Sequence, residues 1–219
     1  MMTTIEPPSH LSTDIDVFES IYTQAEGDRA RVPWDDGQPS PALINWLNAI
    51  APSIVRCGAR VVVPGCGLGD DAVGLLHRGY EVTAFDLSPT AIEWARRDDP
   101  LNERCYHVAD LFETPSRWKH RFDLVVEINT IQSLPPSMRE STLGALKELM
   151  SPHGHLLVIC RGLDETEECP EGPPWPLRES ELLKAASLAG LAAQGDITNF
   201  IDDSGPAPVR RLRGLFRRA

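Results

Sequence analysis

The sequence lacks any long apolar run. About 18 consecutive apolar residues are needed to cross a bilayer, and no stretch of these 219 residues approaches that length. Residues 1–10 have neither a basic start nor an apolar segment, so a secretory signal peptide is not expected. Internal repeats and low-complexity tracts are also missing. These absences indicate a globular protein with no membrane partner.

Cysteine and histidine show none of the spacings that bind metal. The six histidines are scattered, and the five cysteines form no Cys-x-x-Cys pair: they are Cys57, Cys66, Cys105, Cys160 and Cys169. An odd number of widely spaced cysteines is typical of reduced proteins without a disulfide framework. We therefore expect a cytoplasmic protein with no metal site.

An excess of positive charge is missing as well. The 21 basic and 32 acidic side chains give a net charge of -11, and such a surface repels the phosphate backbone of nucleic acids. A small soluble molecule is the more reasonable substrate. The arginines near the C-terminus are expected only to protect an exposed edge strand; they are Arg210, Arg211, Arg213, Arg217 and Arg218.

From residue 60 onward, short apolar segments alternate with helical patterns. Strands are expected at 60–64, 80–85, 103–108, 122–127 and 154–160, with helices at 70–78, 89–97, 137–150 and 178–189. This alternation predicts an α/β fold, in which helices cover both faces of a mostly parallel sheet. Segments 191–200 and 209–216 flank a turn of the type Asp-Asp-Ser-Gly-Pro, which predicts a hairpin and an antiparallel last strand.

The length fits a single domain. Residues 1–13 are polar and contain proline, and we expect them to be disordered. The domain would span residues 14–219, with an N-terminal lid at 14–50 and a core at 58–219. Within the lid, residues 14–25 have the spacing of an amphipathic helix, and three prolines and a glycine make 32–41 a loop.

A glycine loop joins the first strand to the first core helix. In the run Val-Val-Val-Pro-Gly-Cys-Gly-Leu-Gly-Asp, Gly65 and Gly67 allow a tight turn and let a ligand lie against bare backbone. Asp86 ends the next strand, 21 residues after Gly65, where a carboxylate accepts hydrogen bonds from ribose hydroxyls. The combination predicts a site for an adenine-containing cofactor.

Two acids at the start of the helix help to choose that cofactor. A dinucleotide places its pyrophosphate on the amides that open the helix. Here Asp70 and Asp71 are expected to satisfy those amides themselves and to repel phosphate. The glycine spacing is also G-x-G-x-G instead of G-x-G-x-x-G. S-adenosylmethionine carries a positive sulfur and no phosphate, so nearby acids suit it.

At this point the sequence resembles a known family. VVVPGCGLG followed by GYEVTAFDLSPTAIEWA is similar to the class I S-adenosylmethionine-dependent methyltransferases. Pro64 before the first glycine and the upstream run PWDDGQPSPAL resemble the thiopurine, thiol and halide methyltransferase branch. The resemblance covers about residues 15–215 and includes the runs FDLVVEINTIQSLPPSMR and GPPWPL.

The resemblance implies a Rossmann-like sheet of seven strands in the order 3-2-1-4-5-7-6. It also implies the cofactor contacts, from one end of S-adenosylmethionine to the other. The loop residues Gly65, Cys66, Gly67 and Gly69 would surround the amino acid moiety, Asp86 would bind ribose, and Leu87, Asp110, Leu111 and Phe112 would contact adenine. Glu127 and Asn129 would lie beneath the methionine portion, and Trp34 would cover the cofactor as part of the lid. Trp34 has one alternative, a hydrophobic plug under the N-terminal segment.

Four residues are candidates for the acceptor side: Tyr22, Asp35, Gln132 and Arg161. Each has a purely structural alternative. Tyr22 also fits core packing, Asp35 fits a local ion pair, and Gln132 fits a helix cap. Arg161 would neutralise an anionic acceptor or pair with Asp164 or Glu165 in an acidic loop.

These patterns predict methyl transfer from S-adenosylmethionine to a small molecule. A thiol or related soft nucleophile is favoured, because a thiolate needs no base and the sequence shows no obvious one. Glu127 and His107 are weak candidates for a base if the acceptor is a hydroxyl. The alternatives are an aromatic O- or N-methyltransferase, an NAD-dependent oxidoreductase, and a non-catalytic S-adenosylmethionine-binding protein.

Overall fold

The computed structural model describes residues 11–205 and 207–219 and has the expected α/β class. Its strands are β1 (Arg60–Pro64), β2 (Glu81–Asp86), β3 (Tyr106–Val108), β4 (Phe122–Ile128), β5 (Met150–Arg161), β6 (Leu191–Ala193), β7 (Thr198–Asp202) and β8 (Val209–Arg218). Its α-helices are α1 (Leu11–Ala25), α2 (Pro41–Ala49), α3 (Asp70–Leu76), α4 (Pro89–Asp98), α5 (Arg139–Leu149) and α6 (Glu179–Leu188). Short 3-10 helices lie at Arg29–Arg31, Ala51–Ser53, Glu103–Cys105, Leu111–Glu113, Ser116–Trp118, Ile131–Ser133 and Pro136–Met138.

The strands form one sheet in the order β3-β2-β1-β4-β5-β8-β6. Strands β1 to β5 are parallel to their neighbours, and β8 runs antiparallel to β5. The expected class, the order of the first five strands and the antiparallel last strand are therefore confirmed. Because β1, β2 and β4 are adjacent and parallel, their carboxyl ends meet at one edge of the sheet.

The expected number of strands is wrong: residues 11–205 and 207–219 contribute eight strands to the sheet, not seven. Segment 191–200 does not form one continuous strand. Gly195 adopts a φ of 84° and breaks it, so β6 and β7 pair separately with β8 along the same edge. The hairpin between β7 and β8 forms as predicted.

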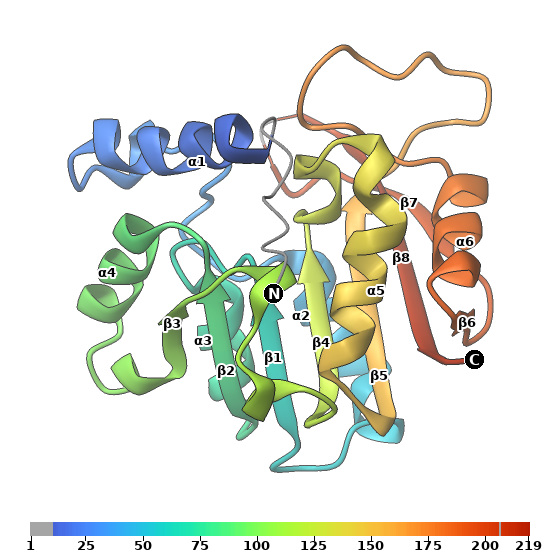
Figure 1. The fold of residues 1–219 in the computed structure, drawn as a ribbon, viewed down its shortest axis with the longest axis horizontal. Coiled ribbons are helices and arrows are strands. Elements are labelled where there is room, and N and C mark those ends of the chain that lie inside the picture. The colour runs from blue at the N-terminus through green and yellow to red at the C-terminus, as the bar shows by residue number, and fades with distance from the viewer. Residues whose placement is uncertain (1–10, 206) are drawn as a thin grey trace, which may run out of the picture.

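Helices cover both faces of the sheet, as Figure 1 shows. Side chains of α2, α3 and α4 pack with Val61, Val63 and Leu124 on one face. Side chains of α5 and α6 pack with Val125 and Val158 on the other face. The alternation of inward side chains along each strand explains why these runs are apolar throughout.

Two segments lie above the carboxyl ends of the strands in Figure 1. Helix α1 is on the side of α4, and the loop between β5 and α6 arches over the other side. Helix α1 begins at Leu11, so the expected boundary of disorder at residue 13 is wrong; residues 1–10 lie outside the described residues. Within the described part of the chain, every helix is too short or too polar to cross a membrane.

Candidate active site

The loop between β1 and α3 turns tightly through glycines. Gly65 and Gly69 have φ values of 62° and 90°, which residues with a Cβ rarely adopt. Both are also covered closely. A Cβ on Gly65 would collide with the Thr130 hydroxyl, and a Cβ on Gly69 would lie 2.7 Å from Tyr106 Cε1. The loop therefore requires glycine at both positions, which leaves bare backbone at the carboxyl end of β1.

Asp86, the last residue of β2, is bonded to this loop. Its Oδ2 accepts from Gly67 N–H at 2.9 Å, and its Oδ1 accepts from Ser88 N–H at 2.9 Å. Burial raises the pKa of the half-buried Asp86 carboxyl, and the backbone N–H groups of Ser88, Gly67 and Leu87 oppose that rise. A carboxylate has about four acceptor sites, so Asp86 can still accept from a ribose hydroxyl.

Tyr22 and Trp34 lie together over the glycine loop. Trp34 Nε1–H donates to Tyr22 Oη at 2.9 Å, and the two rings meet edge to face. The Tyr22 oxygen lies 3.0 Å from the point where a Cβ on Gly67 would be. Trp34 is 43% exposed and also packs edge to face on Phe18 of α1, which fits both a lid over the cofactor and a hydrophobic plug under the N-terminal segment. Tyr22 is buried, so it packs in the lid and contacts the site only through its hydroxyl.

Arg29 joins the N-terminal segment to the core. Its Nη2 lies 2.6 Å from Asp35 Oδ1 and also bonds Asp70 at the start of α3, while its Nη1 lies 3.5 Å from Asp98 Oδ2. Burial raises the pKa of Asp35, but the contacts with Arg29 outweigh it and hold that pKa below its usual value. The Asp35 side chain is only 6% exposed, so the local ion pair is its observed role and not substrate contact.

Asp71 holds the same segment at a second point. Its Oδ1 accepts from Ser40 N–H at 2.7 Å, and burial raises its pKa to about 6. Helix α3 begins after Gly69 without a side-chain cap. The expectation that Asp70 and Asp71 satisfy the helix end is therefore wrong: both bind the N-terminal segment instead. Acids still outnumber cations here, which suits a positively charged ligand.

The residues expected near adenine follow β2 and β3. Asp110 Oδ1 accepts from Phe112 N–H at 2.8 Å and starts a 3-10 turn. Phe112 and Leu87 are 40% and 36% exposed, whereas Leu111 packs against the core. Leu87 and Phe112 are thus exposed apolar side chains that can pack against the face of an adenine ring.

Glu127 is fully buried near the end of β4. Its Oε1 accepts from Ile131 N–H at 2.9 Å, and its Oε2 has no partner among the described residues. Burial raises its pKa to about 7. In this position the side chain supports the turn at Thr130, which covers Gly65.

Asn129 contacts an arginine that sequence reasoning missed. Its φ of 64° turns the chain away from the sheet, and its Oδ1 accepts from Arg211 Nη1 at 2.9 Å. Arg211 also bonds Asp202 Oδ2 through Nε at 2.9 Å. We expected Arg211 only to protect an edge. The signal available was its place at the start of a strand antiparallel to β5, which puts it at the same end of the sheet as Asn129.

Gln132 and Arg161 are in contact, but the contact is made by the backbone N–H of Arg161 and not by its side chain. Gln132 is buried, and its Oε1 accepts from Arg161 N–H while its carbonyl accepts from Trp175 N–H at 2.7 Å. Gln132 therefore ties β5 to the loop that follows, instead of lining a pocket. The Arg161 side chain is exposed and forms no ion pair with a described residue.

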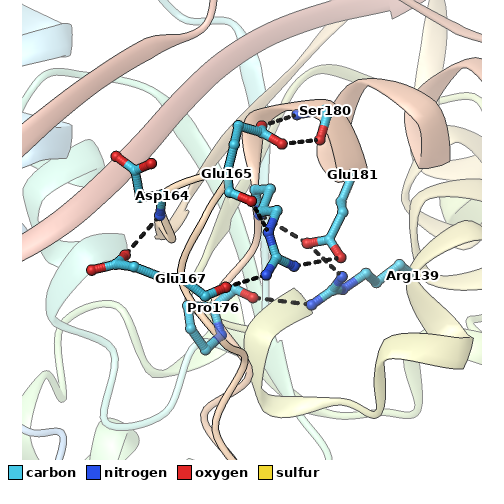
Figure 2. A network of polar contacts seen from close by, with 8 residues as sticks. Arg139, Asp164, Glu165, Glu167, Pro176, Ser180 and Glu181 are labelled. Carbon is cyan, nitrogen blue, oxygen red and sulfur yellow. Dashed lines mark hydrogen bonds and ion pairs between the residues drawn. The ribbon is translucent and has the colours of Figure 1, made fainter.

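The acidic loop between β5 and α6 is held by ordered contacts and is not simply solvated, as Figure 2 shows. Arg178 donates to the carbonyls of Glu165 and Glu167 and pairs with Glu181. Arg139 lies 3.1 Å from the same glutamate. These contacts give the loop a defined shape above the carboxyl end of β5.

His107 is not placed as a base. Its ring packs edge-on against Trp118 at 5.3 Å between centroids, and burial lowers its pKa. No group of three or more His, Cys, Asp or Glu side chains suited to a metal occurs in residues 11–205 and 207–219.

The residues present fit S-adenosylmethionine. The glycine loop presents backbone below Tyr22, Asp86 keeps acceptor capacity, and the Arg29 guanidinium is surrounded by the carboxylates of three aspartates. Together with the strand order, this site defines a class I S-adenosylmethionine-dependent methyltransferase.

Comparison with known proteins agrees with this class. The model of the thiopurine S-methyltransferase (TPMT) family matches residues 24–199. A probable thiol methyltransferase 2 of Arabidopsis thaliana is 27% identical over 173 residues, which are 76% of this chain and 72% of that protein. A 2-heptyl-1-hydroxyquinolin-4(1H)-one methyltransferase of Mycobacteroides abscessus is 26% identical over 178 residues, which are 78% of this chain and 75% of that one.

A solved structure shows the same fold. The 1,6-didemethyltoxoflavin-N1-methyltransferase of Burkholderia thailandensis, with S-adenosylhomocysteine bound, superposes with a TM-score of 0.75 at 20% identity and covers 100% of this chain and 93% of its own. The chain belongs to the thiopurine S-methyltransferase family. It is an S-adenosylmethionine-dependent methyltransferase of small molecules, which decides against the NAD-dependent and the non-catalytic alternatives.

Proposed function

We propose that the acceptor is a thiol or a related soft nucleophile. The observation that carries this proposal is that neither candidate base is available: Glu127 is fully buried with Oε1 bonded to Ile131, and His107 packs on Trp118. S-adenosylmethionine, when bound, supplies an electrophilic methyl group and takes the electrons of the broken carbon–sulfur bond. A thiolate brings its own lone pair, and its proton goes to water, so the protein contributes alignment and exclusion of water.

We propose the following roles for the cofactor-binding residues. The backbone of Gly65, Cys66, Gly67 and Gly69 holds the amino acid moiety, Asp86 binds ribose, and Leu87 with Phe112 contacts adenine. Glu127 acts indirectly, because it positions the turn that covers Gly65. Of the N-terminal segment 14–50, residues 14–40 form a lid on a single domain that spans 14–219, whereas α2 packs in the core. The Tyr22 hydroxyl beside Gly67 and the contacts of Arg29 and Ser40 with α3 support this role.

A second candidate is methylation of an aromatic hydroxyl. It is favoured by the similarity to the Mycobacteroides abscessus enzyme, which is named for a hydroxyquinolinone. We also propose a cytoplasmic protein that does not act on nucleic acid. The net charge of -11 and the five free cysteines support that proposal.

The test is a matched acceptor panel: thiophenol, phenol, aniline and iodide, with S-adenosylhomocysteine formation as the readout. Turnover of the thiol is expected, with or without turnover of iodide, and phenol and aniline should not react. Its kcat/KM should rise with pH only up to the pKa of the thiol, and should shift when a more acidic thiol is used. Turnover of phenol or aniline without thiol turnover would overturn the proposal. A second break in the pH profile that stays fixed when the acceptor changes would reveal a protein base.

A further inference from the structure

Two arginines face each other at the carboxyl end of β5. Arg161 of β5 and Arg211 of β8 are direct partners in the antiparallel pairing. Side chains of such partners leave the sheet on the same face. The neighbouring pair, Cys160 and Leu212, packs in the core on the α5 side. The two arginines therefore share the opposite face, on which α2 and α3 lie.

Arg211 is held rigidly beside the cofactor site. Its Nε and Nη1 are bonded to Asp202 and Asn129, both at 2.9 Å, and its side chain is only 16% exposed. Asn129 precedes Thr130, whose hydroxyl covers Gly65. Nη2 of Arg211 has no acceptor among the described residues. A guanidinium fixed in this way has one edge left for a ligand.

Arg161 has no carboxylate partner among the described residues, because the acids expected to pair with it have other partners. Asp164 pairs with Arg210 at 3.7 Å, and its N–H bonds Glu167. Glu165 accepts from Ser180 Oγ at 2.8 Å. The alternative left open by the sequence, an ion pair of Arg161 with Asp164 or Glu165, is therefore not what the structure shows.

We propose that Arg161 and Arg211 bind a carboxylate of the methyl acceptor, so that the substrate is a small thiol that also carries a carboxylate. Guanidinium groups match the planar geometry of a carboxylate. The carboxylates of Asp202 and Asp71 offset part of the positive charge of Arg161 and Arg211, so the pair suits a monoanion better than a doubly charged phosphate. The inference rests on the proposed thiol acceptor and assigns the group that orients it.

The test compares 4-mercaptobenzoate with its neutral analogue 4-mercaptobenzamide. The wild-type enzyme should have the lower KM for the benzoate. Arg161→Ala should raise that KM about tenfold, the typical effect of losing one charge-assisted contact, with kcat changed by less than about twofold. The amide should show no comparable change. Arg211→Lys keeps the positive charge but loses the planar guanidinium that donates two parallel hydrogen bonds, so it should also raise the KM for the benzoate.

Arg217→Ala is the matched control, because it removes one charge from the other end of β8. It should leave both acceptors unaffected. If Arg161→Ala raised the KM of the benzoate and of the amide equally, the carboxylate site would be refuted. A lower KM of the wild-type enzyme for the amide than for the benzoate would also refute it. A lower KM for an analogue with a phosphate in place of the carboxylate would refute the choice of a monoanion.

Failure of the thiol proposal gives a different result. The protein would then bind S-adenosylhomocysteine in a calorimetric titration but turn over neither thiol. In that case the arginines are tested by titrating 4-(methylthio)benzoate into the S-adenosylhomocysteine complex. Binding that is lost in Arg161→Ala supports the carboxylate site, and no binding to the wild-type complex refutes it.

Discussion

The guanidinium of Arg29 lies between the carboxylates of Asp35 and Asp70. Asp35 follows Trp34 in the lid, and Asp70 is the first residue of the helix after the glycine loop. One side chain therefore links the segment that covers the site to the segment that forms its floor. The Arg29 side chain is 29% exposed, and the side chains of its three aspartate partners are between 6% and 32% exposed. Solvent therefore screens this network only in part.

Loss of Arg29 is expected to weaken cofactor binding. Arg29→Ala leaves Asp35 and Asp70 close together without a cation, which favours lid opening. The Kd for S-adenosylhomocysteine should rise roughly tenfold, measured by calorimetric titration. Arg31→Ala is the control, since Arg31 contacts only the end of α1, through an exposed pair with Glu26 and a long contact with the Ala25 carbonyl among the described residues, and should leave the Kd unchanged. Equal effects of the two variants would rule out the link.

Glu127 is expected to make stability fall as the pH rises. Burial raises its pKa from 4.5 to about 7 in the folded protein, so folding favours the protonated form. The stabilisation is fully present below pH 4.5, declines between pH 4.5 and 7, and is absent above that range. At about 1.4 kcal/mol per pKa unit, the loss is about 3 kcal/mol. Glu127→Gln cannot ionise, so its Tm should exceed that of the wild type at pH 8 and lose this advantage at pH 4.5.

Local spacing explains what the sequence could predict. The glycine loop and Asp86 belong to consecutive strand ends, and parallel pairing of β1 with β2 brings them together. Arg29 and Arg211 could not be placed in the same way, because their partners Asp70 and Asn129 are 41 and 82 residues away. Such contacts depend on how the lid folds back and where β8 inserts. The same limit applied to Gln132, whose partners lie on β5 and the following loop.

Gly69 is expected to tolerate no side chain. A Cβ there would lie 2.7 Å from Tyr106, in addition to the strain of a φ of 90°. Gly79 has a similar φ of 76° but nothing within 4 Å of an added Cβ. Gly79→Ala should therefore cost about 1 kcal/mol of unfolding free energy. Gly69→Ala should cost clearly more and weaken S-adenosylhomocysteine binding. Urea unfolding of both variants measures the difference, and equal destabilisation would show that the Tyr106 contact is unimportant.

The loop between β5 and α6 is expected to affect the acceptor and not the cofactor. Arg178 fixes this loop by donating to the carbonyls of Glu165 and Glu167. The loop is far from the glycine loop in the sequence, and it follows β5, which is separated from β1 by β4 in the sheet. Arg178→Ala should therefore raise the KM of the acceptor about tenfold, which corresponds to the lower end of the roughly 1.5–3 kcal/mol of a charge-assisted hydrogen bond. Hydrogen exchange across residues 163–177 should speed up in the same variant. Lys184→Ala, an equal charge change on the exposed side of α6, should do neither. A matching rise in the S-adenosylhomocysteine Kd of Arg178→Ala would mean that the loop supports the whole site instead of its acceptor side alone.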